Sequence, residues 1–325
     1  MDLESARVRE MIDGYRLSQS IFVATQLCIA DRLAGGAVHY EALATVTETD
    51  PPSLLRLLRA LASAGLVEET GESLFALTSL GRLLRRDAEG SLHAWATLSA
   101  SLFQPWADLL LSIRTGKPAF DSARGKNRWQ HLSDCAGDSR TFNEAMAESS
   151  ELVARELVAS CDLSRFPTVV DVGGGNGILL RKILAAYPGA RGVLFDLPEA
   201  IRDAQAHERC TLVEGSFFDV LPEGGDAYVL SRILHDWNDD RASRILRNTR
   251  RAMANGTTLF VIERILEPDQ PQLEAALSDL GMMLMNGGRE RTLDEFTALL
   301  TSAGFGNARA RPTATRFQIL EAQAS

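Results

Sequence analysis

The sequence predicts an α/β protein in which a doubly wound parallel sheet, closed by an antiparallel C-terminal hairpin, follows a mainly helical N-terminal domain. Three observations predict this class. From Thr168 onward, short apolar runs alternate with helical patterns, which is typical of a parallel sheet with helices on both faces. A glycine-rich turn follows the first run, at the place where such sheets bind ligands. The final segment, ARARPTATRFQILEAQA, contains no helical stretch and is expected to form the hairpin.

Residues 1–90 are expected to form a winged helix-turn-helix. A helix restarts at Pro51 and Pro52, and the segments GLVEE and LFALT flank a turn at Thr70 and Gly71. This shape suggests DNA binding, but these residues include nine arginines, no lysine and thirteen acidic residues, a net charge of −4. A protein that reads duplex DNA needs several phosphate contacts. We therefore expect a dimerisation or lid role for this domain.

Composition limits the other classes of function. The chain has 34 basic and 43 acidic residues, a formal charge of −9, and no long basic cluster that would favour nucleic acid. Its four cysteines lack metal-ligand spacing, so neither a zinc site nor a disulfide framework is predicted. The N-terminus does not have the pattern of a signal peptide, and no apolar run reaches about 18 residues. We expect a cytoplasmic protein with no membrane partner and no bound metal.

Residues 91–165 are expected to be a helical linker between the N-terminal domain and a C-terminal domain of residues 166–325. Within the linker, IRTGKPAFDSARGKN over residues 113–127 combines glycine and proline with polar residues. This composition predicts a surface loop.

The turn DVGGGNG does not fit the dinucleotide fingerprint G-x-G-x-x-G. Gly173 and Gly175 fit, but the third position is Ile178. Asp171 would repel a diphosphate and would attract an ammonium group, directly or through water. Asp196 ends the next strand, where a carboxylate can accept both hydroxyls of a ribose. These features predict a nucleoside with a cationic amino-acid tail, a description that S-adenosylmethionine (SAM) matches.

Five segments carry a resemblance to a known family: VVDVGGGNG, LFDLPEAI, LSRILHDWNDD, VIERILEPD and NGGRERTLDEFTALLTSAGF. Together they resemble the class I O-methyltransferases of small molecules, which include plant caffeate and flavonoid enzymes and bacterial polyketide, anthracycline and phenazine enzymes. The resemblance covers nearly the whole chain. It implies a Rossmann-like SAM-binding catalytic domain that releases S-adenosylhomocysteine, a linker that helps to line the substrate pocket, and a homodimer formed through the N-terminal domain.

The resemblance also implies a catalytic set of His235, Glu263 and Glu290. His235 follows the fourth strand and would be the general base that deprotonates the acceptor hydroxyl. Methyl transfer from a sulfonium is an in-line displacement, so the protein aligns the reacting atoms and removes a proton. A phenol of pKa about 10 and a histidine of about 6.5 differ by roughly 3.5 units, so a carboxylate on the other ring nitrogen would help. Glu263 ends the fifth strand, and Glu290 precedes a helix that opens with a capping box at Thr292.

Other residues are assigned by the same resemblance. Trp237 matches an aromatic that packs on adenine, while Ser216 and Ser231 replace an acid and a lysine of family members and still offer hydroxyls. The predicted cofactor residues are Asp171, Gly173, Gly175, Asp196, Leu197, Ser216, Phe217, Phe218, Ser231, Arg232 and Trp237. The predicted substrate-pocket residues are Trp129, Phe142, Met146, Asp236, Met282, Met285 and Asn286.

The leading hypothesis is a metal-independent O-methyltransferase that acts on an aromatic hydroxyl of a polyketide or phenolic secondary metabolite. Methylation of nitrogen, carbon or a carboxylate remains an alternative. A SAM-sensing transcriptional regulator is disfavoured by the acidic N-terminal domain, and an NAD-dependent dehydrogenase is disfavoured by Ile178. The segment SARGKNRWQHL lacks the run of aromatic and acidic residues that is usual in bacterial members. The identity of the acceptor is therefore not inferred from theirs.

Overall fold

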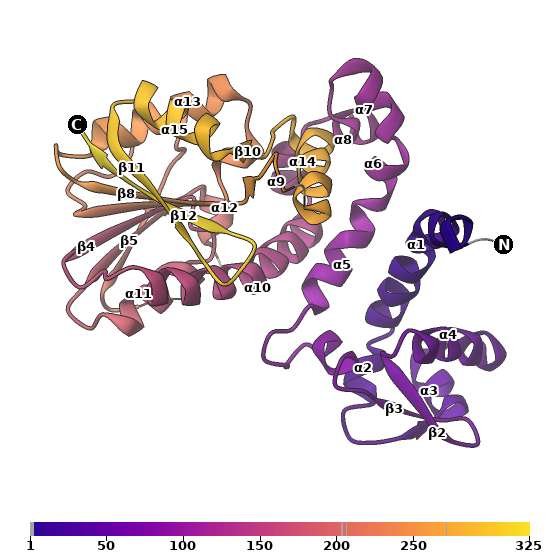
Figure 1. Cartoon of the computed structure of the whole chain (residues 1–325). Helices are drawn as coiled ribbons and strands as arrows, with labels where there is room; N and C mark the ends of the chain where they lie inside the picture. Colours follow the sequence, from indigo (N-terminus) through magenta and orange to yellow (C-terminus); the bar gives the residue numbers. More distant parts are fainter. Residues whose placement is uncertain (1–2, 203, 206, 271) are drawn as a thin grey trace. The chain divides into compact units, whose positions relative to one another are not determined.

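The computed structural model describes residues 3–202, 204–205, 207–270 and 272–325 (Figure 1). Contacts divide the chain into two compact units. Unit 1 comprises Met1–Phe103 and Arg140–Glu148, and unit 2 comprises Gln104–Ser139 and Ser149–Ser325. The long helix α10 (Ala136–Ser160) contributes residues to both units, so part of the predicted linker belongs to each of them.

Unit 1 packs helices against a small antiparallel sheet with the strand order β1-β3-β2. The hairpin predicted around Thr70 and Gly71 is confirmed as β2 and β3, and a further short strand, β1, lies beside β3. Helix α4 begins at the predicted prolines, where Asp50 accepts a hydrogen bond from the Ser53 amide at 2.9 Å. The elements are α1 (Leu3–Gln26), α2 (Ile29–Arg32), β1 (Val38–His39), α3 (Tyr40–Thr47), α4 (Pro51–Ser63), β2 (Val67–Gly71), β3 (Leu74–Leu77), a 3-10 turn η1 (Gly81–Leu84) and α5 (His93–Ser101).

Unit 2 is built on a seven-stranded sheet with the order β11-β12-β8-β7-β4-β5-β6. The strands from β6 to β8 pair in parallel, whereas β12 is antiparallel to β8 and β11 to β12. The doubly wound sheet and its C-terminal hairpin are therefore confirmed. The strands are β4 (Thr168–Val172), β5 (Arg191–Asp196), β6 (Cys210–Glu214), β7 (Ala227–Ser231), β8 (Thr258–Glu263), β11 (Phe305–Pro312) and β12 (Gln318–Ala324).

The order of the strands explains where a ligand would lie. The chain runs from β4 outward to β5 and β6, and then returns to β7 and β8 on the other side of β4. The direction of winding therefore reverses at β4, and such a switch point opens a crevice at the carboxyl ends of the strands.

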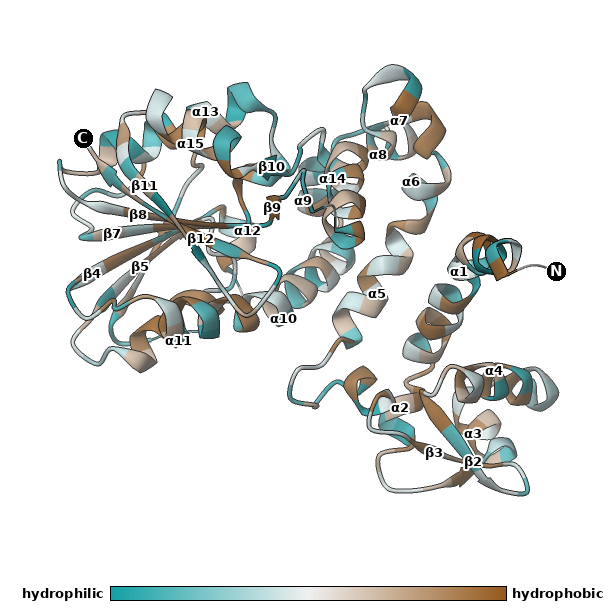
Figure 2. Ribbon diagram, viewed as in Figure 1, coloured by the Kyte–Doolittle hydropathy of each residue, from teal (hydrophilic) through white to brown (hydrophobic). Residues whose placement is uncertain are grey.

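Both faces of this sheet are covered by helices, because its central strands are apolar on both sides (Figure 2). Along β8, Leu259 and Val261 join one core with α13 and α15, while Phe260 and Ile262 join the other with α10 and α11. The remaining elements are α11 (Ile178–Ala186), α12 (Pro198–Ile201), a 3-10 turn η2 (Leu234–Asp236), α13 (Asp239–Ala252), β9 (Ile265–Leu266), α14 (Leu273–Asn286), β10 (Arg291–Thr292) and α15 (Leu293–Ser302).

The surface loop predicted for residues 113–127 is wrong. That segment contains the end of α7 (Leu109–Thr115) and all of α8 (Ala119–Arg124), and it lies between α6 (Phe103–Ala107) and α9 (Arg128–Asp134). Gly116 and Gly125, with φ angles of 67° and 70°, end the two helices, so the glycines mark helix ends within a compact helical segment. Within the described residues, no helix is both long and apolar enough to cross a membrane.

Candidate active site

The glycine turn lies between β4 and α11, at the carboxyl edge of the sheet. Gly173, Gly175 and Gly177 have φ angles of 72°, 58° and 77°, in the left-handed region that favours glycine. A Cβ on Gly174 would lie 2.5 Å from the Asp171 carboxylate, whereas a Cβ on Gly175 would meet no atom within 4 Å. The turn is therefore packed tightly against β4 and is open at Gly175.

Asp171, in β4, is 1% exposed, and its carboxylate oxygens make no well-formed hydrogen bond with the described residues, although the Leu180 amide of α11 acts to lower its pKa. Burial, followed by the negative charge of Asp196, raises the pKa of Asp171 to about 7. A buried polar group without a partner is costly. The site is therefore suited to a cationic group from a ligand.

Asp196 ends β5 and lies directly against the glycine turn. Its Oδ2 accepts a hydrogen bond from the Gly175 amide at 2.8 Å, and its Oδ1 accepts one from the Leu197 amide at 2.7 Å. Burial raises the pKa of Asp196, and these two amides act in the opposite direction. The structure thus brings together the two acids that the sequence singles out.

Trp237 follows η2 and lies in a cluster of aromatic rings. Its ring stacks on that of Trp129, with centroids 5.9 Å apart, and meets the ring of Phe218 edge-on at 4.8 Å. Phe217 packs against it at 6.0 Å. The Ser216 hydroxyl accepts a hydrogen bond from the Phe218 amide at 3.2 Å and so fixes the turn that carries both phenylalanines. A predicted pocket residue and three predicted cofactor residues are therefore neighbours.

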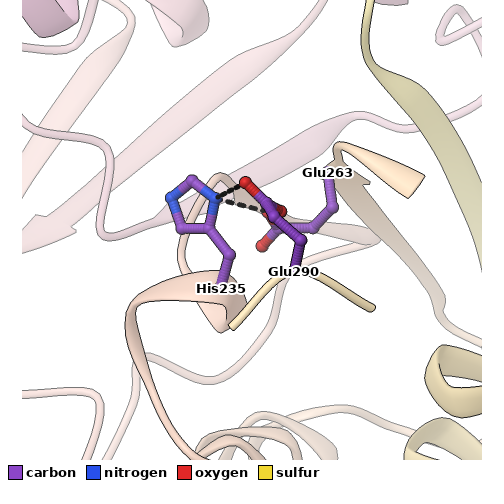
Figure 3. A group of neighbouring side chains, drawn as sticks. All are labelled: His235, Glu263 and Glu290. Carbon is purple, nitrogen blue, oxygen red and sulfur yellow. Dashed lines mark ion pairs between the residues drawn. The ribbon is translucent and has the colours of Figure 1, made fainter. Parts of the chain in front are cut away.

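His235 lies in η2, after β7, and the carboxylates of two buried glutamates face the same nitrogen of its ring (Figure 3). Its Nδ1 is 3.4 Å from Glu263 Oε2 and 3.4 Å from Glu290 Oε1. Glu263 Oε1 accepts hydrogen bonds from the amides of Ile233 and Leu234 at 3.0 and 2.7 Å, which bind it to the turn that carries the histidine. Figure 3 shows the other ring nitrogen, Nε2, pointing away from both carboxylates. Asp236 Oδ1 lies 3.9 Å from Nε2, beyond hydrogen-bond distance, so Nε2 is the nitrogen that can reach an acceptor.

A pair of short strands explains why two glutamates far apart in sequence converge. Glu263 ends β8 just before β9, and Glu290 directly precedes β10. Strands β9 and β10 pair in parallel, with Arg291 opposite Ile265. In this register Glu290 comes opposite Arg264, the residue after Glu263, so the pairing brings the segments that carry the two glutamates together. The capping box predicted at Thr292 is confirmed and begins α15 immediately afterwards.

The charges around His235 favour its imidazolium form. Burial alone lowers the pKa of His235, but the negative charges of Glu263, Asp236 and Glu290 outweigh it and raise that pKa to about 9. Burial raises the pKa of Glu263 to about 7. For Glu290, the opposing effect of burial is outweighed by His235 and by the Ser278 hydroxyl, which donates to Oε1 at 2.7 Å, so its pKa is lowered. The site is built to receive a proton at His235.

This arrangement predicts that kcat/KM for methyl transfer rises with pH, with an inflection near pH 9. A histidine whose pKa is raised to about 9 is protonated below that pH, and only its neutral form can accept a proton. In Glu290→Gln the pKa of His235 falls, so the inflection moves to lower pH and the maximal rate falls with the lost stabilisation of the imidazolium. Initial rates across the pH range measure both effects. An inflection that stays near pH 9 in Glu290→Gln would contradict this account.

Other predicted residues surround this centre. Asn286, at the end of α14, donates a hydrogen bond to Asp236, which lies next to His235. Ser231 ends β7 with a buried hydroxyl that has no hydrogen-bond partner among the described residues. Arg232 has a φ of 56° and donates to the Ser150 hydroxyl at 2.8 Å. Met285 is buried and Met282 half-buried, both on α14.

Phe142 and Met146 belong to unit 1. Both side chains pack there against the core formed by Ala94, Leu98 and Ala145. Their assignment to the substrate pocket stays a prediction.

Sequence reasoning missed several residues of the site. Arg128, at the start of α9, is buried, and burial lowers its pKa while the charge of Asp236 opposes that effect. Ser278 donates to Glu290, and Asp279 accepts a hydrogen bond from the Glu290 amide at 2.8 Å. Arg291 is fully buried beside η2. The capping residue Asn127, which opens α9, was a local signal for a helix there, but no local signal marks any of these side chains as part of the site.

His235, Glu263 and Glu290 are also the one set of His, Cys, Asp and Glu side chains, within the part of the chain that the structure describes, whose ligand atoms lie close enough to hold a metal ion. These atoms lie within 4.8 Å of one another. One oxygen of each carboxylate already accepts hydrogen bonds from the chain. The expectation that no metal binds stays a prediction.

Known proteins match this chain over almost its whole length. The family described as O-methyltransferase domain matches residues 106–306, and the O-methyltransferase dimerisation domain matches residues 9–87. A phenazine O-methyltransferase of Lysobacter antibioticus is 38% identical over 327 residues, with 98% of this chain and 96% of the relative covered. A phenazine-1-carboxylate N-methyltransferase of Pseudomonas aeruginosa is 33% identical over 304 residues, with 91% and 90% covered.

A solved structure adds a ligand-bound comparison. An O-methyltransferase of neocarzinostatin biosynthesis, in complex with SAM and 2-hydroxy-5-methyl naphthoic acid, has a TM-score of 0.82 to this chain and 33% identity. The match covers 95% of this chain and 96% of the other.

Proposed function

The chain belongs to the O-methyltransferase family, and on this premise we propose that it transfers a methyl group from SAM to a hydroxyl of a small aromatic natural product. The observation that carries the proposal is the pairing of His235 Nδ1 with two buried glutamates while Nε2 points away from them. A histidine held in this way is suited to take a proton from a hydroxyl. The acids that suit the cofactor lie near the carboxyl ends of neighbouring strands, Asp171 one residue before the end of β4 and Asp196 at the end of β5.

The residues at the glycine turn fit the chemistry of SAM. The buried carboxyl of Asp171 suits the ammonium group, and the Ser231 hydroxyl suits the cofactor carboxylate. Asp196 would accept the ribose hydroxyls beside the open Gly175, and Trp237 with its aromatic neighbours would pack on adenine. When bound, SAM supplies a methyl group on a positively charged sulfur.

The chain's own residues would then perform the acid–base step. His235 Nε2 would accept the proton that the acceptor hydroxyl loses when it is methylated. Glu263 and Glu290 stabilise the imidazolium that results, because both face Nδ1. Glu263 is itself fixed by the amides of Ile233 and Leu234, so the ring is oriented before the acceptor binds.

Binding of SAM is expected to release a proton from Asp171. With its pKa raised to about 7, this carboxyl is about half protonated at pH 7, and an ammonium group beside it favours the ionised form. Wild type should therefore release up to about half a proton more than Asp171→Asn at pH 7. Calorimetric titrations in two buffers of different ionisation enthalpy measure the difference. Equal proton release by the two proteins would contradict this role of Asp171.

The proposed reaction is tested with purified protein, SAM and matched aromatic acceptors that differ only in carrying a hydroxyl, an amine or a carboxylic acid. Mass spectrometry should detect a methylated hydroxyl compound together with S-adenosylhomocysteine. Methylation of the amine alone would favour the N-methyltransferase alternative, which the Pseudomonas relative supports. No methylated product from any acceptor, with SAM bound, would overturn the proposed function.

We also propose that the chain forms a homodimer through its N-terminal domain. The match to a dimerisation domain over residues 9–87 supports this. Helix α1 also exposes apolar side chains, among them Val8, Met11, Ile12 and Tyr15, which a partner could cover. Sedimentation at the mass of a single chain of 35.4 kDa would contradict the proposal.

A further inference from the structure

Arg291 is a charged side chain with no exposed surface, although it takes no part in the proposed reaction. A buried guanidinium is costly unless its five N–H groups find acceptors. The hydrogen bonds of the Arg291 guanidinium go to Leu234 of η2, to Trp237 just after η2, to Asp239 at the start of α13 and to the neighbouring Arg289. These contacts connect Arg291 to the segment that carries His235.

The guanidinium binds the backbone on both sides of His235. Its Nη1 donates to the Leu234 carbonyl at 2.9 Å, and its Nη2 donates to the Trp237 carbonyl at 2.7 Å. Its Nε donates to Asp239 Oδ1 at 2.9 Å, and Nη1 also lies 3.4 Å from the Arg289 carbonyl. These contacts use the planar donor arrangement that distinguishes arginine from lysine.

The segment before Arg291 lies against the same turn. A Cβ on Gly288 would lie 2.1 Å from the His235 carbonyl oxygen, so only glycine allows this approach. The Arg289 amide donates to that carbonyl at 2.9 Å. Residues 288–291 therefore form a clasp on η2, and the same clasp carries Glu290, whose carboxylate faces His235.

Glu263 binds the same turn through the turn's amides. Its Oε1 accepts the amides of Ile233 and Leu234, while Arg291 takes the carbonyls of Leu234 and Trp237. The turn is thus fixed through its donors by one segment and through its acceptors by the other. The pairing of β9 with β10 joins the two segments.

From these contacts we infer that Arg291 is a positioning residue for the proposed reaction, which sets the place of His235 relative to Glu263 and Glu290. The inference rests on the proposed function for its kinetic consequence only. The position of the imidazole between the two carboxylates is a property of the protein without substrate. It can be measured whether or not the chain methylates a given acceptor.

The test compares Arg291→Lys with Arg250→Lys in the full-length protein. Arg250 is a matched control, because its guanidinium also donates to main-chain carbonyls, those of Met253 after α13, Gly304 after α15 and Ser325 after β12. Both lysine variants lose hydrogen bonds to main-chain carbonyls and should unfold at a lower temperature. Only Arg291→Lys should disturb His235.

Two measurements separate positioning from stability at a temperature where both variants are folded. The first is an NMR titration of the His235 ring, identified among the five histidines by its loss in His235→Gln. The pKa of His235 should fall from about 9 towards 6.5 in Arg291→Lys and stay unchanged in Arg250→Lys. The second is steady-state kinetics, in which Arg291→Lys should lower kcat about 10- to 100-fold with the Kd for SAM unchanged within about twofold.

A His235 pKa in Arg291→Lys equal to that in wild type would overturn the inference, even if the variant melts earlier. If Arg291→Lys does not fold, Asp239→Ala tests the same clasp, because it removes the carboxylate that Arg291 Nε and Nη2 contact at 2.9 and 2.8 Å. It should shift the same pKa in the same direction by a smaller amount. An unaltered pKa there would equally reject the role of the clasp, whereas a shifted pKa in a protein without methyltransferase activity would reject only the proposed function.

Discussion

Replacing His235 with alanine should lower kcat about 10²- to 10⁴-fold while leaving the Kd for SAM within about twofold of wild type. The imidazole faces Glu263 and Glu290 through Nδ1 and would meet the acceptor through Nε2, so its loss removes the base. The contacts proposed for SAM come from other residues, at the glycine turn and the end of β5. Single-turnover rates with a phenolic acceptor, together with calorimetry for SAM, measure the two effects separately.

The residual activity of His235→Ala distinguishes a missing base from a damaged fold. Without the base, the acceptor must lose its proton to water, so the remaining rate should rise with pH and be greatest for acceptors of low pKa. The matched variant His235→Gln keeps most of the volume of the side chain and should show the same loss. Unchanged kcat in both variants would mean that deprotonation by His235 is not part of the reaction.

Asp196→Ala should raise the Kd for SAM at least about 100-fold, the second large effect. A carboxylate that accepts both ribose hydroxyls makes two charge-assisted hydrogen bonds, each contributing about 1.5–3 kcal/mol. The same carboxylate accepts the amide of Gly175 at 2.8 Å, so its removal also releases the glycine turn from β5. Calorimetric titration with SAM provides both Kd values.

Glu214→Ala is the control for Asp196→Ala. Glu214 ends β6 opposite Asp196, at the same edge of the sheet, but it is exposed. Its removal changes the net charge by the same amount, and the Kd for SAM should stay within about twofold. Equal affinities of Asp196→Ala and Glu214→Ala for SAM would reject the assignment of Asp196 to the ribose.

Much of the fold could be predicted from the sequence, because its signals are local. The strands after Thr168 contain short apolar runs, the hairpin has no helix between its strands, and the helices at Pro51 and Thr292 carry their caps within a few residues. The segment 113–127 was misjudged for the same reason. Its glycines were equally compatible with a loop and with helix ends, and the burial of Ala119 and Phe120 that decides between them depends on residues distant in sequence.

The site could be predicted only in part. Asp171, Asp196 and Glu263 stand at or near strand ends, where topology alone brings them to one edge, and the resemblance marked His235 and Glu290. Arg291 and Arg128 could not be identified, because an arginine in a charged segment is normally a solvated surface residue. What makes them part of the site is the backbone of η2 and the carboxylate of Asp236, which the fold brings to them from far along the chain.

The short ladder between β9 and β10 has a consequence for how this chain can vary in length. The ladder fixes Glu290 opposite Arg264, the residue after Glu263, so one residue inserted between Glu263 and Ile265, or between Glu290 and Arg291, would shift one carboxylate relative to the imidazole. Insertions in the exposed turns at the amino edge of the sheet carry no such penalty. We therefore expect homologues that use this histidine as a proton acceptor to keep the spacing of each glutamate from its short strand.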